Sequence, residues 1–110
     1  MIKLWIDDVR PAPDGYVWCK SVEEAKTAIS RSVFRLAKSI ESGNPDWTLK
    51  IELIDLDHDA GDYGPPDYIR IFDWLEETGH NYPIRIHSAN VVGVENMRRI
   101  IQRNGWKEVF

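Results

Sequence analysis

Two groups of carboxylates stand out in this chain of 110 residues, because each follows an apolar stretch. Residues 1–6 lead into Asp7-Asp8, and residues 49–54 lead into the run Asp55-Leu56-Asp57-His58-Asp59. A lone carboxylate is costly to remove from water, so carboxylates gathered at the ends of buried strands indicate a positive group between them. Mg²⁺ takes oxygen ligands from a few carboxylates and leaves positions for water and phosphate. The two groups therefore predict a divalent-cation site.

The elements that must position these side chains can be read from the pattern of apolar residues. Five segments have the composition of strands: residues 2–6, 16–19, 50–56, 84–87 and 107–110. A first helix is predicted from the capping-box sequence at Ser21 to near Gly43, with a stripe formed by Val22, Ala25, Ile29, Val33, Leu36 and Ile40. A second is predicted over residues 67–78, burying Tyr68, Ile71, Phe72 and Leu75. A third is predicted between Asn90 and Gly105, burying Val94, Met97 and Ile101.

Alternation of strands and helices predicts an α/β sandwich with a mostly parallel sheet. One helix is missing from the alternation, because residues 10–15, rich in proline, join the first two strands directly. A connection of about nine residues can cross back over a short strand, yet it also permits an antiparallel edge strand. The sequence leaves the orientation of the second strand open.

Open α/β sheets bind ligands beyond the carboxyl ends of their strands. Asp7-Asp8, the run 57–59 and His87-Ser88 all fall at such ends, so three separated pieces of sequence meet at one edge. Strand alternation places Asp57 on the face of Asp55, which lies deeper and is expected to support the site rather than form it. The simpler interpretations remain open: an Asp pair is common in turns, and Ser88 is a suitable helix cap.

Composition limits the class of protein. The length fits one domain, residues 1–110, and 43% hydrophobic residues indicate a folded chain. A net charge of −4 gives no general attraction to nucleic acid or to an anionic membrane, and no apolar run is long enough to span a bilayer. Cys19 is the only cysteine and follows Trp18 in an apolar run, so a buried, inert thiol and a cytoplasmic setting are expected.

Three motifs together resemble a known family. They are Lys3-Leu4-Trp5-Ile6-Asp7-Asp8-Val9-Arg10-Pro11, Leu56-Asp57-His58-Asp59 and Ile86-His87-Ser88-Ala89-Asn90. In this order they resemble the cyclic-phosphate-processing receiver-like domain, and more distantly the receiver domains of two-component signalling. The resemblance covers essentially the whole chain. It implies a receiver-like (flavodoxin-like) three-layer sandwich with a mostly parallel five-stranded sheet, in which a loop replaces the first helix.

The resemblance also implies a function, which is the metal-dependent processing or sensing of cyclic phosphates. The ligand would be a 2′,3′-cyclic phosphate on a nucleotide or at an RNA end, as in RNA repair. Mg²⁺ or Mn²⁺ would be held by Asp8 and Asp57 with help from Asp7 or Asp59. His58 and His87, with Asp57, would carry the catalysis of a phosphoesterase, and which histidine is acid and which base is left open. Ser88, Asn90 and Arg10 would bind the phosphate.

Other interpretations were weighed against this one. A phosphoacceptor receiver would be phosphorylated on Asp57, but such domains carry a Lys at the end of the fifth strand, and here Lys107 stands at the wrong end. A domain that only binds phosphate would carry much the same residues. A toprim-type enzyme also pairs acids after a strand, but that family opens with Glu-Gly where this chain has Asp7-Asp8.

Two further features bear on nucleic-acid binding. Arg98, Arg99 and Arg103 on the third predicted helix form either a basic face or an ordinary solvated one, and the second interpretation is favoured by their place near the helix C-terminus. Of the five tryptophans, Trp47 follows Asn44-Pro45-Asp46 and is the one whose exposure needs checking.

Overall fold

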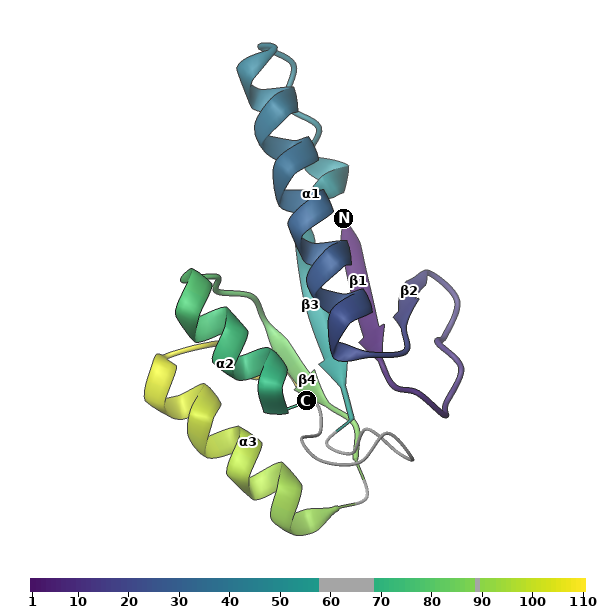
Figure 1. Ribbon diagram of the computed structural model, residues 1–110, viewed down its shortest axis with the longest axis vertical. Helices are drawn as coiled ribbons and strands as arrows, with labels where there is room; N and C mark the ends of the chain where they lie inside the picture. Colours follow the sequence, from purple (N-terminus) through teal and green to yellow (C-terminus); the bar gives the residue numbers. More distant parts are fainter. Residues whose placement is uncertain (58–68, 89) are drawn as a thin grey trace.

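The computed structural model describes residues 1–57, 69–88 and 90–110. Its strands are β1 (Ile2–Ile6), β2 (Tyr16–Cys19), β3 (Ile51–Leu56) and β4 (Ile84–Ile86). Its helices are α1 (Val22–Glu41), the short 3₁₀ helix η1 (Trp47–Leu49), α2 (Ile69–Thr78) and α3 (Val91–Asn104). Four of the five predicted strands and all three predicted helices are confirmed, with boundaries that differ by one or two residues (Figure 1).

The four strands form one parallel sheet in the order β2-β1-β3-β4. The orientation that the sequence left open is thus parallel for β2, which pairs with β1 from Lys3↔Tyr16 to Ile6↔Cys19. The nine residues 7–15 are long enough to return the chain to the start of a four-residue strand. Because β1 and β3 are neighbours in the sheet, the two acidic ends of the chain come together as expected.

The predicted fifth strand, residues 107–110, is wrong. The chain makes a single parallel bridge to β4, in which Ile84 donates to the Lys107 oxygen at 2.8 Å and accepts from the Val109 nitrogen at 2.7 Å. The side chains of Glu108 and Phe110 in this segment contact α3. Arg98 of α3 makes two hydrogen bonds of 3.0 Å from Nε to the Glu108 carboxylate, and its guanidinium lies over the Phe110 ring.

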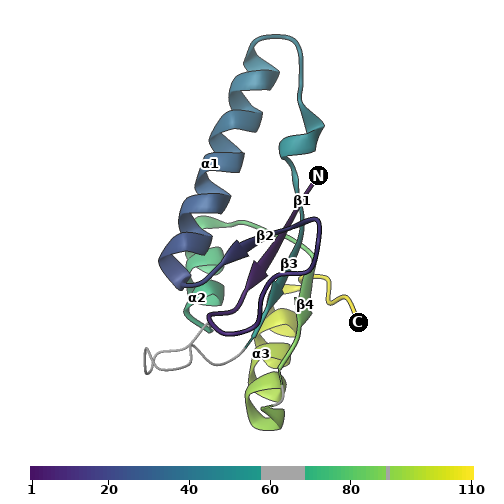
Figure 2. The same cartoon turned by 90° about the vertical axis from the view of Figure 1, so that its right-hand side faces the viewer.

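All three helices cover the same face of the sheet. The connections from β2 to β3, from β3 to β4 and from β4 to the bridge all move in one direction across the sheet, and right-handed crossovers then place α1, α2 and α3 on one side. Figure 2 shows α1 and α2 on one side and much of the loop that joins β1 to β2 on the other. The described residues therefore form two layers, and the three-layer arrangement expected from the resemblance is not found in them.

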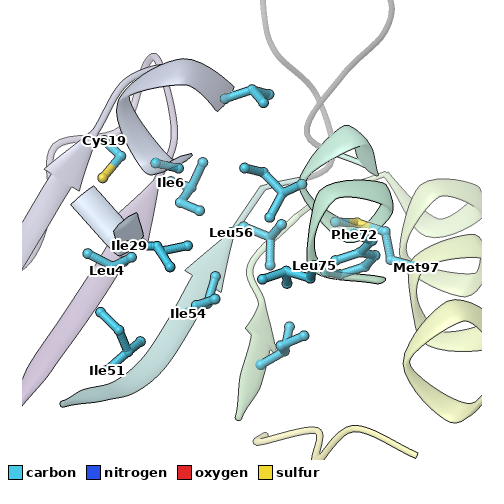
Figure 3. Close-up of a cluster of buried hydrophobic side chains, with 14 of the residues drawn as sticks. Leu4, Ile6, Cys19, Ile29, Ile51, Ile54, Leu56, Phe72, Leu75 and Met97 are labelled. Atoms are coloured by element: carbon cyan, nitrogen blue, oxygen red, sulfur yellow. The ribbon is translucent and has the colours of Figure 1, made fainter. Parts of the chain in front are cut away.

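One hydrophobic core lies between the sheet and the helices (Figure 3). Leu4, Ile54 and Ile84 are paired across the sheet and are fully buried, so they mark its helix-covered face. The helices contribute the predicted Ile71, Phe72, Leu75, Met97 and Ile101. Val94 is only half-buried, and Tyr68 lies outside the described residues.

Helix α1 extends beyond the end of the sheet, as Figure 1 shows. Its stripe is buried at Val22, Ala25 and Ile29, but Val33 and Ile40 are 37% and 48% exposed. The stripe is therefore core only in the first half of the helix. Twenty residues of helix span about 30 Å, whereas strands of five or six residues span about 17–20 Å. None of the helices that the structure describes is long and apolar enough to cross a membrane.

Candidate functional site

The imidazole of His87 is held between two buried carboxylates. Its Nδ1 lies 2.5 Å from Oδ1 of Asp55, and its Nε2 lies 3.0 Å from Oδ2 of Asp7. Both aspartates are fully buried, while His87 keeps 11% of its side chain exposed. The indole of Trp5 stacks on the imidazole with ring centroids 3.7 Å apart and planes 5° from parallel. These contacts fix the position and the tilt of the ring.

Strand pairing explains how these residues meet. Trp5 on β1 is paired with Asp55 on β3, and Asp55 is paired with Arg85 on β4, so the three side chains stand in a row on one face. Asp7 and His87 come two residues after Trp5 and Arg85, on the same face by alternation. This face is the one that no described helix covers. Asp55 lies on β3 between Trp5 and His87, whose stacked rings cover it.

Asp7 forms a turn and takes part in the site at the same time. Its Oδ1 accepts hydrogen bonds from the backbone nitrogens of Val9 at 2.8 Å and Arg10 at 2.9 Å, and its Oδ2 is the atom that faces His87. Its main-chain oxygen accepts from Nε1 of Trp18 at 2.6 Å. The interpretation of the acidic pair as part of a turn thus holds for Asp7. A metal ion bound by Asp7 would have to share a carboxylate that already makes three hydrogen bonds.

Asp55 carries an unsatisfied atom. Its Oδ2 is buried and has no hydrogen-bond partner among the described residues, and Nη1 of the Arg85 guanidinium lies 3.6 Å from it. Arg85 is itself 49% exposed. The sequence placed Asp55 in a supporting position below the site, and the structure brings it into direct contact with His87.

The two contacts of His87 limit how hydrogens can be shared in this cluster. An ionised carboxylate only accepts hydrogen bonds, so His87 can bond two ionised aspartates only when each ring nitrogen carries a hydrogen. With both carboxylates ionised, the arrangement is one imidazolium between two carboxylates, with Arg85 as a second cation beside Asp55. A group of this kind can donate a proton or stabilise an anion that approaches it.

The other predicted acids lie at the same edge of the sheet. Asp8 and Asp57 are half-buried at the ends of β1 and β3, and the Asp57 nitrogen donates to the Ile6 oxygen at 3.0 Å. His58 and Asp59 lie outside the described residues. Within the described ranges no three His, Cys, Asp or Glu side chains are placed to hold a metal ion. Two carboxylates still fit Mg²⁺ chemically, because that ion is often held by one or two carboxylates and completes its coordination with water and phosphate.

The predicted phosphate contacts surround the start of α3. Oδ1 of Asn90 accepts from the Gly93 nitrogen at 2.9 Å and so caps the helix, while Oγ of Ser88 accepts from the Asn90 nitrogen at 3.1 Å. The cap is therefore Asn90, not Ser88. Arg10 is exposed. Its backbone joins Asp7 to Trp5, since its oxygen accepts from Nε1 of Trp5 at 2.9 Å.

Sequence reasoning missed two members of this site. Neither Trp5 nor Arg85 was placed in the site, although Trp5 precedes Asp7 by two residues and Arg85 precedes His87 by two residues. That spacing is the signal that places each pair on one face of a strand. The signal could not be used without knowing that the face has no helix on it.

Comparison with known proteins identifies the family of the chain. The model of the cyclic-phosphate processing receiver domain family matches residues 2–103. No curated protein and no solved structure gives a significant match. The family match spans β1 to α3 and includes all the residues around His87, and the chain therefore belongs to the cyclic-phosphate processing receiver domain family.

Proposed function

We propose that this domain hydrolyses cyclic phosphates in a reaction that depends on Mg²⁺ or Mn²⁺, with a nucleoside 2′,3′-cyclic phosphate or an RNA end as ligand. The observation that carries the proposal is the pair of contacts from Asp7 and Asp55 to His87. A histidine used only for packing has no need of two buried carboxylates on its two nitrogens. The same edge holds the half-buried Asp8 and Asp57 and the start of α3.

His87 is the candidate general acid. In hydrolysis, water attacks phosphorus, one ring phosphorus–oxygen bond breaks, and the departing sugar oxygen takes a proton. The Nε2 hydrogen of His87 is suited to this transfer, because the Asp55 contact through Nδ1 keeps the ring oriented when Nε2 leaves Asp7 for the ligand. With His87 as the acid, His58 is the remaining candidate for the base that accepts the proton of the attacking water.

Asp8 and Asp57 are the residues that would hold the metal, with Asp7 and Asp59 as further candidates. When bound, such an ion supplies positive charge to a non-bridging phosphate oxygen. The chain itself offers an anion site beside it. The Ser88 hydroxyl can donate, and the first backbone amides of α3 point out of the helix N-terminus.

A turnover assay with a nucleoside 2′,3′-cyclic phosphate tests the proposal. Mg²⁺ or Mn²⁺ is expected to support hydrolysis to a monophosphate, and EDTA to abolish it. His87→Gln is expected to lower kcat by about 10²–10⁴-fold, the usual contribution of a general acid. His80→Gln is the matched control, because His80 also packs against aromatic rings, those of Trp74 and Tyr82, but lies after α2, away from the site.

Metal binding is tested separately by a Mg²⁺ and Mn²⁺ titration followed by tryptophan fluorescence. We expect saturable binding in the native chain and in Asp73→Asn, whose carboxylate is exposed on α2, and loss of binding in Asp8→Asn and Asp57→Asn. Binding of the cyclic phosphate without turnover would leave a domain that senses its ligand. No binding of either metal or cyclic phosphate would contradict the proposal, and phosphorylation of Asp57 by a small phosphodonor would replace it with a receiver switch.

A further inference from the structure

The sheet face opposite the helices has an unusual composition for a surface. We define this open face by Lys3, Trp5, Tyr16, Trp18 and Arg85, which share it through the pairings Lys3↔Tyr16, Trp5↔Trp18 and Trp5↔Asp55↔Arg85. No helix of the described residues covers it. The loop of residues 7–15 contacts part of it, through the bonds from Trp5 to the Arg10 oxygen and from Trp18 to the Asp7 oxygen.

The rings of the open face form a continuous row that begins at the proposed reaction centre. His87 stacks on Trp5 at 3.7 Å, and Trp5 meets the edge of Tyr16 with centroids 5.9 Å apart and planes at 82°. The row crosses the sheet from β4 to β2. All three residues are half-buried rather than buried, so each keeps part of its surface accessible to solvent. A group attached to a phosphate bound near His87 would meet this row next.

Cations accompany the rings. Nζ of Lys3 lies 5.6 Å from the centre of the Tyr16 ring, and Nζ of Lys20 lies 4.4 Å from the centre of Trp18. Arg85 is half exposed beside Asp55. The carboxylates of Asp7 and Asp55 are fully buried. In a chain of net charge −4, the strands of the open face thus present positive charge and aromatic rings, while Asp8 and Asp14 lie in the adjoining loop of residues 7–15.

We infer that the open face binds the nucleoside of the cyclic-phosphate ligand, with the base against Tyr16 and Trp5 and with Lys3 near its polar edge or a neighbouring phosphate. Aromatic side chains flanked by cations contact bases without regard to their sequence, because every base has a π-face. The inference rests on the proposed function and adds to it the surface that binds the base of the nucleotide or RNA end, a surface that a cyclic phosphate of a simple alcohol or sugar would not use.

The experiment compares the affinity of two ligands by calorimetry: adenosine 2′,3′-cyclic phosphate and glycerol 1,2-cyclic phosphate, which has no base. Adenosine 2′,3′-cyclic phosphate is expected to bind at least about tenfold more tightly, the effect of one stacked base. Tyr16→Leu and Lys3→Gln are each expected to remove most of that preference while the affinity for the glycerol compound stays unchanged. If the chain hydrolyses the ligands, the same comparison is made on KM.

Helix α1 offers matched controls. Lys38 lies over Phe34 with Nζ 5.5 Å from the ring centre, nearly the geometry of Lys3 over Tyr16, but at the end that projects past the sheet. Phe34→Leu and Lys38→Gln are expected to leave both affinities unchanged.

Three outcomes would overturn the inference. Equal affinities for the two ligands would remove the nucleoside site while leaving the proposed function intact. Failure of both ligands to bind would overturn the proposed function and the inference with it. A change of oligomeric state in Tyr16→Leu, seen by sedimentation velocity without ligand, would assign the open face to a contact between protein chains.

Discussion

Asp55 shows how one residue connects stability to the site. Its carboxylate is fully buried, contacts Nδ1 of His87 through Oδ1, and has Nη1 of Arg85 3.6 Å from Oδ2. Its neighbours on both sides in sequence, Ile54 and Leu56, belong to the core on the opposite face of β3. The sequence run 55–59 therefore divides between two tasks. Asp55 holds a histidine, and Asp57 reaches the edge of the sheet.

Asp55→Ala is expected to lower the free energy of unfolding by about 3 kcal/mol, because removing one partner of a buried charge pair leaves the other uncompensated. Urea denaturation monitored by circular dichroism measures the change. Asp73→Ala, an exposed carboxylate on α2, should change it by less than about 0.5 kcal/mol. If Asp55→Ala loses less than about 1 kcal/mol, the contact between Asp55 and His87 contributes no net charge interaction to stability.

Burial in the core lowers the reactivity of the Cys19 thiol. It is 2% exposed, as the sequence predicted, and burial together with the nearby Glu24 carboxylate raises the pKa of its thiol to about 11. Burial disfavours the thiolate, so in the folded chain the reactive form is present in only about one molecule in a thousand at pH 8. In the unfolded chain it is present in roughly a quarter of the molecules.

Alkylation by iodoacetamide at pH 8 should therefore be far slower in the native protein than in urea. Mass spectrometry of the labelled chain measures both rates. Raising the pH toward 11 should increase the native rate as the thiolate forms. Equal rates in the native and unfolded chains would place the thiol at the surface, against its observed burial.

At the scale of the element, α3 combines a structural cap with a predicted phosphate contact. Oδ1 of Asn90 accepts from the Gly93 nitrogen, so this oxygen already caps the N-terminus of the helix. Gly105 ends the same helix at its other terminus in the left-handed conformation, with φ of 68°. The sequence signals for both ends were local, and both helix ends are found near where they were predicted.

Asn90→Ala is expected to cost about 1 kcal/mol of stability through loss of the cap, whereas Asn90→Asp should retain most of it because an aspartate also caps. Thermal and urea unfolding measure the two effects. The pair also separates cap from ligand contact: if Asn90 donates to phosphate, Asn90→Asp should weaken ligand binding although the helix is intact. Equal stability of Asn90→Ala and the native chain would contradict the capping role.

At the scale of the whole molecule, the length of the sheet decides which apolar residues become core. Ile29 and Ile40 belong to one stripe of α1 and are the same residue type, yet Ile29 is fully buried and Ile40 is 48% exposed. Nothing in the periodicity distinguishes them. The difference arises because α1 continues past the strands that its first half covers, as Figure 1 shows.

Ile29→Ala should therefore destabilise the fold by about 3 kcal/mol, the cost of a cavity in a packed core. Ile40→Ala should cost less than about 1 kcal/mol, as expected for a largely exposed side chain. Chemical denaturation of the two variants measures both losses, which are compared at an unchanged slope of unfolding free energy against denaturant concentration. Similar losses would show that a partner or a second copy covers the projecting end in solution.

The sequence by itself determined four strands and three helices, their order, and the edge of the sheet at which the acidic residues and His87 lie. Strand ends, helix caps and buried stripes are local features, because a few neighbouring residues decide each of them, and the motifs around Asp7, Asp57 and His87 identified the family. Tertiary structure alone decided that His87 bonds Asp55 and Asp7, which lie 32 and 80 residues away in sequence. It also decided that the fifth strand is reduced to one bridge and that one sheet face has no described helix on it. The physical reason is that these outcomes depend on which strands become neighbours and how far each helix reaches over them, and no single segment contains that information.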